Sequence, residues 1–161
     1  MKMDIIKKYF WLISASAVFC FGTVLALSYE VSGHTAWSII VSSVNSSAWE
    51  CLKPFALVNI FWIFIELSYL RPSLLRFVSS RILFLDIFVI STFLILRFFE
   101  LDTIRYYVIL LLLVTAMFLS YKLYDSKMRC DLFFIPLIIS FVILFFMLLI
   151  FSVRPPLWVL P

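Results

Sequence analysis

The chain has 161 residues, of which 65% are hydrophobic and 14% are charged. A soluble domain is about half apolar and about a quarter charged, so this composition excludes an ordinary soluble protein. The net charge of +4 would suggest nucleic-acid binding in a soluble protein. Here the positive residues stand at the ends of apolar runs, as orientation signals do, and we expect no nucleic-acid partner. The composition predicts an all-α, polytopic transmembrane helical bundle that forms a single integral membrane domain over residues 1–161.

The first apolar run covers residues 9–27 and contains no charged residue. Its length suits a helix that crosses a bilayer, which needs about 20 apolar residues. The run is longer than the apolar part of a signal peptide, so a retained membrane span is expected. Gly22 and Ala26 within it are a small-xxx-small pair, a spacing that allows a neighbouring helix to approach closely.

Four further apolar runs are expected to cross the membrane, at about residues 54–70, 82–99, 106–121 and 132–153. The second span is expected to begin at Pro54, because proline suits the first turn of a helix. Arg71, Arg76 and Arg81 are then expected in the connection between the second and third spans. The sequence contains no internal repeat, so a transporter built from two inverted halves is not indicated.

A short apolar segment, Thr35 to Val44, separates the first two spans. It is too short to cross a bilayer as a helix. Two placements remain open, an interfacial helix and a re-entrant piece shielded by protein, because unpaired backbone is not tolerated against lipid. Trp37 and Trp49 favour the interface, since indole rings prefer the level of the lipid headgroups.

The charges between the apolar runs predict the orientation of the chain. The N-terminal segment, the connection with the three arginines and the connection over residues 122–131 are each net positive. The positive-inside rule places these three segments in the cytoplasm. Residues 28–53, the turn at 100–105 and the C-terminal tail then lie outside. We therefore expect a multi-pass protein of the cell membrane with a cytoplasmic N-terminus and an outer C-terminus.

Polar side chains concentrate in the loop between the first two predicted spans, most densely just before Pro54. We call eight of them the outer polar cluster: Tyr29, Glu30, His34, Asn45, Ser47, Trp49, Glu50 and Lys53. One interpretation is structural, because Ser47-x-x-Glu50 has the spacing of a capping box and Glu50 can pair with Lys53 at i,i+3. The other is an outward-facing polar pocket. Under the structural interpretation, Glu50→Gln is nearly neutral and Ser47→Ala costs about 0.5–2 kcal/mol.

The residue types of a catalytic or metal site are incomplete in this cluster. His34 is the single histidine of the chain, and a zinc site needs three or four protein ligands, so we expect no metal and no cofactor. Ser47, His34 and Glu50 are of the types that serve as nucleophile, base and orienting acid, but nothing in their spacing brings them together. The three cysteines are an odd number and far apart, which indicates neither a disulfide framework nor a metal site. No catalytic residue is predicted.

Glu66 and Asp86 are acids within the second and third predicted spans, each near the cytoplasmic end. A charged group inside a membrane is costly and usually faces protein or water. One alternative is an ion pair with Arg71, Arg76 or Arg81 just outside the span, or a side chain that extends to the headgroups. The other is a protonatable carboxylate in a transport path. That role needs further polar partners at mid-depth, and none is evident in the sequence.

Four motifs are distributed over nearly the whole chain: Tyr29-Glu30-x-Ser32-Gly33, Val44-Asn45-x-Ser47-x-Trp49-Glu50-x-Leu52-Lys53, Glu66, and Pro155-Pro156. They resemble the pattern H-x-x-YEWSG, VNES-x-WEH-x-K and YPPH-x-PLF-x-DP of an uncharacterised family of small bacterial multi-pass membrane proteins. The resemblance implies a helical membrane protein, and it implies no particular activity.

The chain departs from the family pattern at positions that could carry chemistry. Ala26, Cys51 and Leu157 stand where the family has histidines. Ser46 stands in place of an acid, and Val31 in place of a tryptophan. If the family uses those imidazoles and carboxylates for metal or acid–base chemistry, this chain has lost most of them. The resemblance therefore implies a non-catalytic member.

The predicted function is that of a non-catalytic structural or interaction component of the membrane. A first alternative is a small-molecule binding or transport component that acts as an oligomer or with a partner. A second alternative is a membrane enzyme with an outward-facing polar site. The expected partners are the lipid bilayer and either a second copy of the chain or another membrane protein.

Overall fold

The computed structural model describes residues 2–32, 48–70, 73–99, 104–126 and 134–153. These residues form helices and no strand. The helices are α1 (Lys2–Val31), α3 (Ala48–Leu70), α4 (Leu74–Phe99), α5 (Arg105–Asp125) and α6 (Phe134–Val153). The all-helical class predicted from the composition is confirmed.

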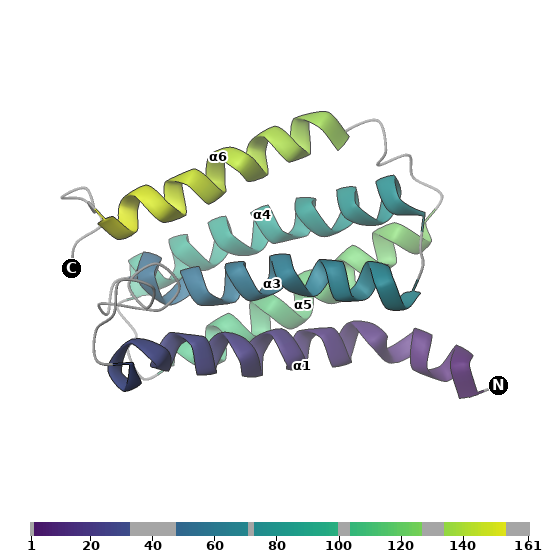
Figure 1. The fold of residues 1–161 in the computed structure, drawn as a ribbon, viewed down its shortest axis with the longest axis horizontal. Helices are drawn as coiled ribbons and strands as arrows, with labels where there is room; N and C mark the ends of the chain where they lie inside the picture. The colour runs from purple at the N-terminus through teal and green to yellow at the C-terminus, as the bar shows by residue number, and fades with distance from the viewer. Residues whose placement is uncertain (1, 33–47, 71–72, 100–103, 127–133, 154–161) are drawn as a thin grey trace.

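Successive helices run in opposite directions along the molecule (Figure 1). α1, α3, α4 and α5 form an antiparallel bundle, in which α3 and α5 each contact both α1 and α4. α6 lies outside this bundle, parallel to α4 and mainly against it. The first residues of α1, α4 and α6 and the last residues of α3 and α5 share one end of the molecule. These helix ends lie within or next to the three segments whose positive charge predicted a common side.

Four helices are long and apolar enough to cross a membrane, over Tyr9–Ser28, Glu50–Leu70, Leu74–Phe98 and Arg105–Asp125. They correspond to the first four predicted spans. α6 coincides with the fifth, but its described apolar segment is only Ile135–Leu144, so a fifth crossing stays a prediction. The segment Thr35 to Val44 lies outside the described residues, and neither of its two predicted placements is tested.

The core lies where the four helices of the bundle meet. Its buried apolar side chains come from all four of them and include Ala15, Val18, Leu52, Phe55, Leu85, Phe88, Val89, Ile109, Leu113 and Met117. Phe55 is fully buried and stacks on Phe19, with 5.8 Å between the ring centroids. A Cβ at Gly22 would lie 2.9 Å from Cε1 of Phe55. The predicted close approach of a neighbouring helix is therefore confirmed at Gly22, where α1 packs against Phe55 of α3.

The predicted start of the second span at Pro54 is wrong. α3 begins at Ala48, and Pro54 lies inside the helix. A proline there lacks the N–H that would donate to the carbonyl of Glu50, which weakens this part of the helix. Every residue from Glu50 to Leu57 is nevertheless buried. We infer that packing against the neighbouring helices outweighs the lost hydrogen bond.

The predicted start of the third span near Ile82 is also wrong, because α4 begins at Leu74. Tyr124 of α5 contacts this early part of α4. Its hydroxyl accepts a hydrogen bond from the backbone N–H of Ser73 at 3.3 Å. The guanidinium of Arg76 lies 5.6 Å from the centroid of the same ring, a distance at which a cation–π attraction operates.

The earlier start of α4 changes the position of three charged side chains. Arg76 and Arg81 belong to the helix and not to the connection before it. Asp86 stands at the middle of this 26-residue helix, so its predicted position near the cytoplasmic end is wrong. Glu66 lies in the last third of α3, which agrees with its predicted position.

Candidate functional site

Five charged side chains are buried among the described residues: Glu50, Lys53, Glu66, Arg81 and Asp86. A buried charge is strongly unfavourable unless an opposite charge or several hydrogen bonds compensate it. The five occupy three places in the fold. One is a network between α3, α4 and α5, one is an ion pair at the start of α3, and one is a groove between α4 and α6.

We call the network between α3, α4 and α5 the Arg81 network, because the guanidinium of Arg81 lies at its centre. Nε of Arg81 donates to Oε2 of Glu66 at 2.8 Å, and the two side chains are 3% and 0% exposed. Nη2 of Arg81 donates to Oδ1 of Asn59 at 3.0 Å. Asn59 and Glu66 are seven residues apart and therefore lie on one face of α3. That face of α3 is held to α4 by one arginine.

Side chains of α5 complete the Arg81 network. Nη1 of Arg81 contacts Sδ of Met117 and donates to Oγ of Ser120 at 3.4 Å. The hydroxyl of Tyr121 donates to Oε1 of Glu66 at 3.1 Å. Both oxygens of the carboxylate thus accept a hydrogen bond, and all three guanidinium nitrogens have a contact. The network links three helices and pairs its charges internally.

The prediction of an ion pair between Glu66 and one of three arginines is confirmed for Arg81. The pair is not just outside the span, because both side chains are buried within the bundle. The extension of Glu66 toward the headgroups is therefore excluded. Asp86 differs from Glu66, because it pairs with none of the arginines in the described part of the chain.

The second place is an ion pair in the first turns of α3. Nζ of Lys53 lies 2.9 Å from Oε2 of Glu50, and the side chains are 0% and 3% exposed. The predicted i,i+3 pairing is confirmed. From α5, Nη1 of Arg105 donates to Sγ of Cys51 at 3.0 Å. This end of α3 is thus covered by protein, which the sequence alone did not predict.

Most of the outer polar cluster falls outside the described residues or side chains. His34, Asn45 and Ser47 lie outside the described ranges. The backbones of Tyr29, Glu30 and Trp49 are helical, at the end of α1 and the start of α3, but their side chains are not described. Among the members whose side chains are described, the structure brings together Glu50 and Lys53. The capping role of Ser47 and the outward pocket stay predictions.

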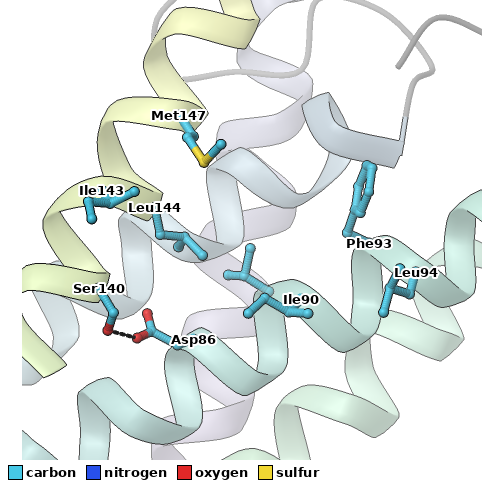
Figure 2. Close-up of a pocket in the computed structure, with 9 residues that line it drawn as sticks. Asp86, Ile90, Phe93, Leu94, Ser140, Ile143, Leu144 and Met147 are labelled. Atoms are coloured by element: carbon cyan, nitrogen blue, oxygen red, sulfur yellow. Dashed lines mark hydrogen bonds between the residues drawn. The ribbon is translucent and has the colours of Figure 1, made fainter. Parts of the chain in front are cut away.

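The third place is a groove between α4 and α6 at Asp86. Oγ of Ser140 donates to Oδ2 of Asp86 at 2.6 Å, while Oδ1 is buried and has no hydrogen-bond partner among the described residues. Figure 2 shows the two side chains facing each other from neighbouring helices. The groove has a volume of about 380 Å³, and its other lining residues are Val89, Ile90, Phe93, Leu94, Ile143, Leu144 and Met147. It is an apolar space with one acid and one hydroxyl.

Several residues of these sites were not predicted, namely Asn59, Met117, Ser120, Tyr121 and Ser140. A signal was present for most of them, since each of the polar ones interrupts an apolar run, and such residues usually face a neighbouring helix. Met117 carries no signal of this kind. The sequence could not show which helix each side chain faces, because that depends on the packing of helices far apart in the chain.

The three places differ from a metal centre in the side chains that they bring together. Within the described ranges, no group of three or more histidine, cysteine or acidic residues is placed to hold a metal ion. In the Arg81 network, the donors and acceptors form hydrogen bonds with one another. Comparisons of the chain with known protein families, with curated proteins and with solved structures find no match.

Proposed function

We propose that this chain is a non-catalytic structural or interaction component of the cell membrane, which acts by association with a second copy or with another membrane protein. One observation carries the proposal, the closed hydrogen bonding of the Arg81 network. Groups that satisfy one another across three helices fix the helix arrangement. They are poorly placed for proton transfer, which requires a group that can reach a substrate.

The proposed arrangement in the membrane has five spans with a cytoplasmic N-terminus. α6 has 20 residues and no charged residue, and at 1.5 Å per residue it is about as long as the hydrocarbon core is thick, about 30 Å. The orientation is supported by the positive charge of the three segments assigned to the cytoplasm. Burial of Arg81 against Glu66 removes one charge from that count, but Arg71 and Arg76 remain.

Labelling of single cysteines tests this orientation. Ser32 and Ser73 are exposed. Ser32 follows the last residue of α1 and Ser73 precedes the first residue of α4, and these two helix ends lie at opposite ends of the bundle. In a chain whose own three cysteines are replaced, we expect Ser32→Cys to react with an impermeant maleimide in intact cells. Ser73→Cys should react only in inside-out vesicles. Labelling of both positions from the same side contradicts the topology. If Ser73→Cys reacts in intact cells and Ser32→Cys reacts only in inside-out vesicles, the orientation is the reverse of the proposed one.

The association is tested by the mass of the purified chain. One copy has a mass of 18.9 kDa. After gentle solubilisation, light scattering corrected for detergent is expected to give a protein mass of two or more copies, or of one copy with a stoichiometric partner. The same sample after complete unfolding provides the reference for a single copy. A strict monomer that carries no other protein would count against the interaction function.

A second candidate function, small-molecule binding, is favoured by the groove between α4 and α6. Its volume of about 380 Å³ lies within the range of about 300–1,000 Å³ that is usual for ligand sites. A bundle of this size has little room for a pathway open to both sides, so transport would need several copies or a partner. The enzyme alternative depends on the outer polar cluster, most of which is not described.

We also propose that the chain is a divergent member of the uncharacterised family that it resembles. The support lies in the order of its motifs, from Tyr29-Glu30 through Asn45 and Trp49-Glu50 to Lys53 and Glu66. Two of these residues, Glu50 and Lys53, form a buried pair, and Glu66 joins the Arg81 network. A profile built from authenticated members should align all four motifs with this chain in register. Alignment of one motif alone would contradict membership.

A further inference from the structure

Asp86 is exceptional among the buried charges of the described helices, because it has no oppositely charged partner there. Glu50 pairs with Lys53 and Glu66 pairs with Arg81. Asp86 is 8% exposed and stands at the middle of α4, far from both helix ends. Its Oδ1 atom has no hydrogen-bond partner within the described ranges. An acid in this position lacks both a countercharge and a donor for one oxygen.

The groove beside Asp86 has the form of a binding site for a slender apolar group. It extends along α4 from Asp86 to Leu94, which is about 12 Å at 1.5 Å per residue. Val89 is buried beneath it, whereas Ile90, Leu94, Ile143 and Met147 are exposed at its sides. Figure 2 shows Leu144 between Asp86 and Met147, with Ile90, Phe93 and Leu94 following Asp86 along α4. The groove therefore opens at the lipid-facing surface of the helices.

We propose that this groove binds a lipophilic amine, that is, a protonated amino group with an apolar tail. The ammonium donates a hydrogen bond to Oδ1 of Asp86 and supplies the missing positive charge. The tail lies along the groove toward Leu94 and Met147. Ser140 holds the other carboxylate oxygen, Oδ2, at 2.6 Å and so orients the carboxylate.

The position of Asp86 selects this class of ligand over other lipids. A phospholipid headgroup stays at the interface, whereas Asp86 is at mid-helix, within the hydrocarbon region of the proposed topology. Its phosphate would also meet an acid of the same sign. A neutral alcohol could donate to Oδ1 but would leave the carboxylate without a countercharge. An ammonium meets both requirements, since buried charges are retained when they are paired.

Equilibrium binding of radiolabelled dodecylamine to the purified full-length chain tests the proposal. The measurement is made in a neutral maltoside detergent, at a pH where the amine is protonated. We expect saturable binding of about one amine per chain, and Asp86→Asn should weaken it about tenfold or more, as expected for loss of a hydrogen bond to a charged group. Asparagine is close to aspartate in size, and the elution volume of the variant verifies that it folds.

A pair of tryptophan variants tests the place of the tail. Leu94 lines the groove, whereas Leu111 is exposed on α5, away from it. Leu94→Trp should abolish saturable binding with Asp86 unchanged, and Leu111→Trp should leave it as in the wild type. Equal binding by both variants, or by wild type and Asp86→Asn, would overturn the proposal.

Competition with unlabelled dodecanol separates the amine from a neutral lipid. Dodecanol has the same tail and a hydroxyl, but no charge, so it should displace the amine only at concentrations at least about tenfold higher. Equal competition would show a site for neutral lipids and would contradict the role of the ammonium. This inference rests on the second candidate function, small-molecule binding at the same groove, and is independent of the structural function proposed first. The amine can fail to bind while the chain still associates, and the reverse outcome is equally distinct.

Discussion

Arg81→Met is expected to lower the free energy of unfolding by about 3–5 kcal/mol, the usual effect of removing one partner from a buried ion pair. The variant leaves the Glu66 carboxylate 0% exposed and without the guanidinium that donates to it at 2.8 Å. It also removes the donor to Asn59. The loss is measured by reversible unfolding in mixed micelles, followed by circular dichroism or tryptophan fluorescence.

Two further variants show whether this loss comes from the pair itself. Arg97→Met changes an exposed arginine near the end of the same helix, and its effect should remain within about 0.5 kcal/mol. Adding Glu66→Gln to Arg81→Met should restore most of the stability, because no buried charge is then left alone. If Arg81→Met costs no more than Arg97→Met, the Arg81 network does not hold the helices together.

The second large effect is expected at Glu50. Glu50→Gln should lower the free energy of unfolding by roughly 3 kcal/mol, since it removes the negative charge 2.9 Å from the fully buried Lys53 ammonium. The buried pair therefore predicts a large loss of stability for Glu50→Gln, whereas the capping interpretation of the sequence predicts a nearly neutral effect. A glutamine preserves a capping box at the surface of a protein, but it does not neutralise a buried ammonium.

The matched control for Glu50 is Asp125→Asn, which removes an exposed acid from the last turn of α5. Its effect should remain within about 0.5 kcal/mol. Lys53→Met in the Glu50→Gln background should recover stability, because both charges are then absent. A Glu50→Gln variant as stable as Asp125→Asn would support the surface cap and contradict the buried pair.

Class and approximate spans followed from the sequence by itself. An apolar run of about 20 residues can satisfy its backbone in a membrane only as a helix or within a closed barrel. Four of the predicted spans accordingly coincide with helices long and apolar enough to cross a membrane. The pairing of Glu50 with Lys53 was also predictable, because i,i+3 neighbours lie on one face of a helix. These features depend only on residues close together in the chain.

The helix starts and the partners of the other acids were decided by the tertiary structure. The sequence places Arg81 in the connection just before the apolar run that begins at residue 82. In the folded chain its charge is paired by Glu66, which belongs to another helix, so α4 continues through it. The same extension places Asp86 at mid-helix opposite Ser140, a residue 54 positions away. Whether a charge ends a helix or lies inside it depends on the partner that packing supplies, and no local pattern contains that information.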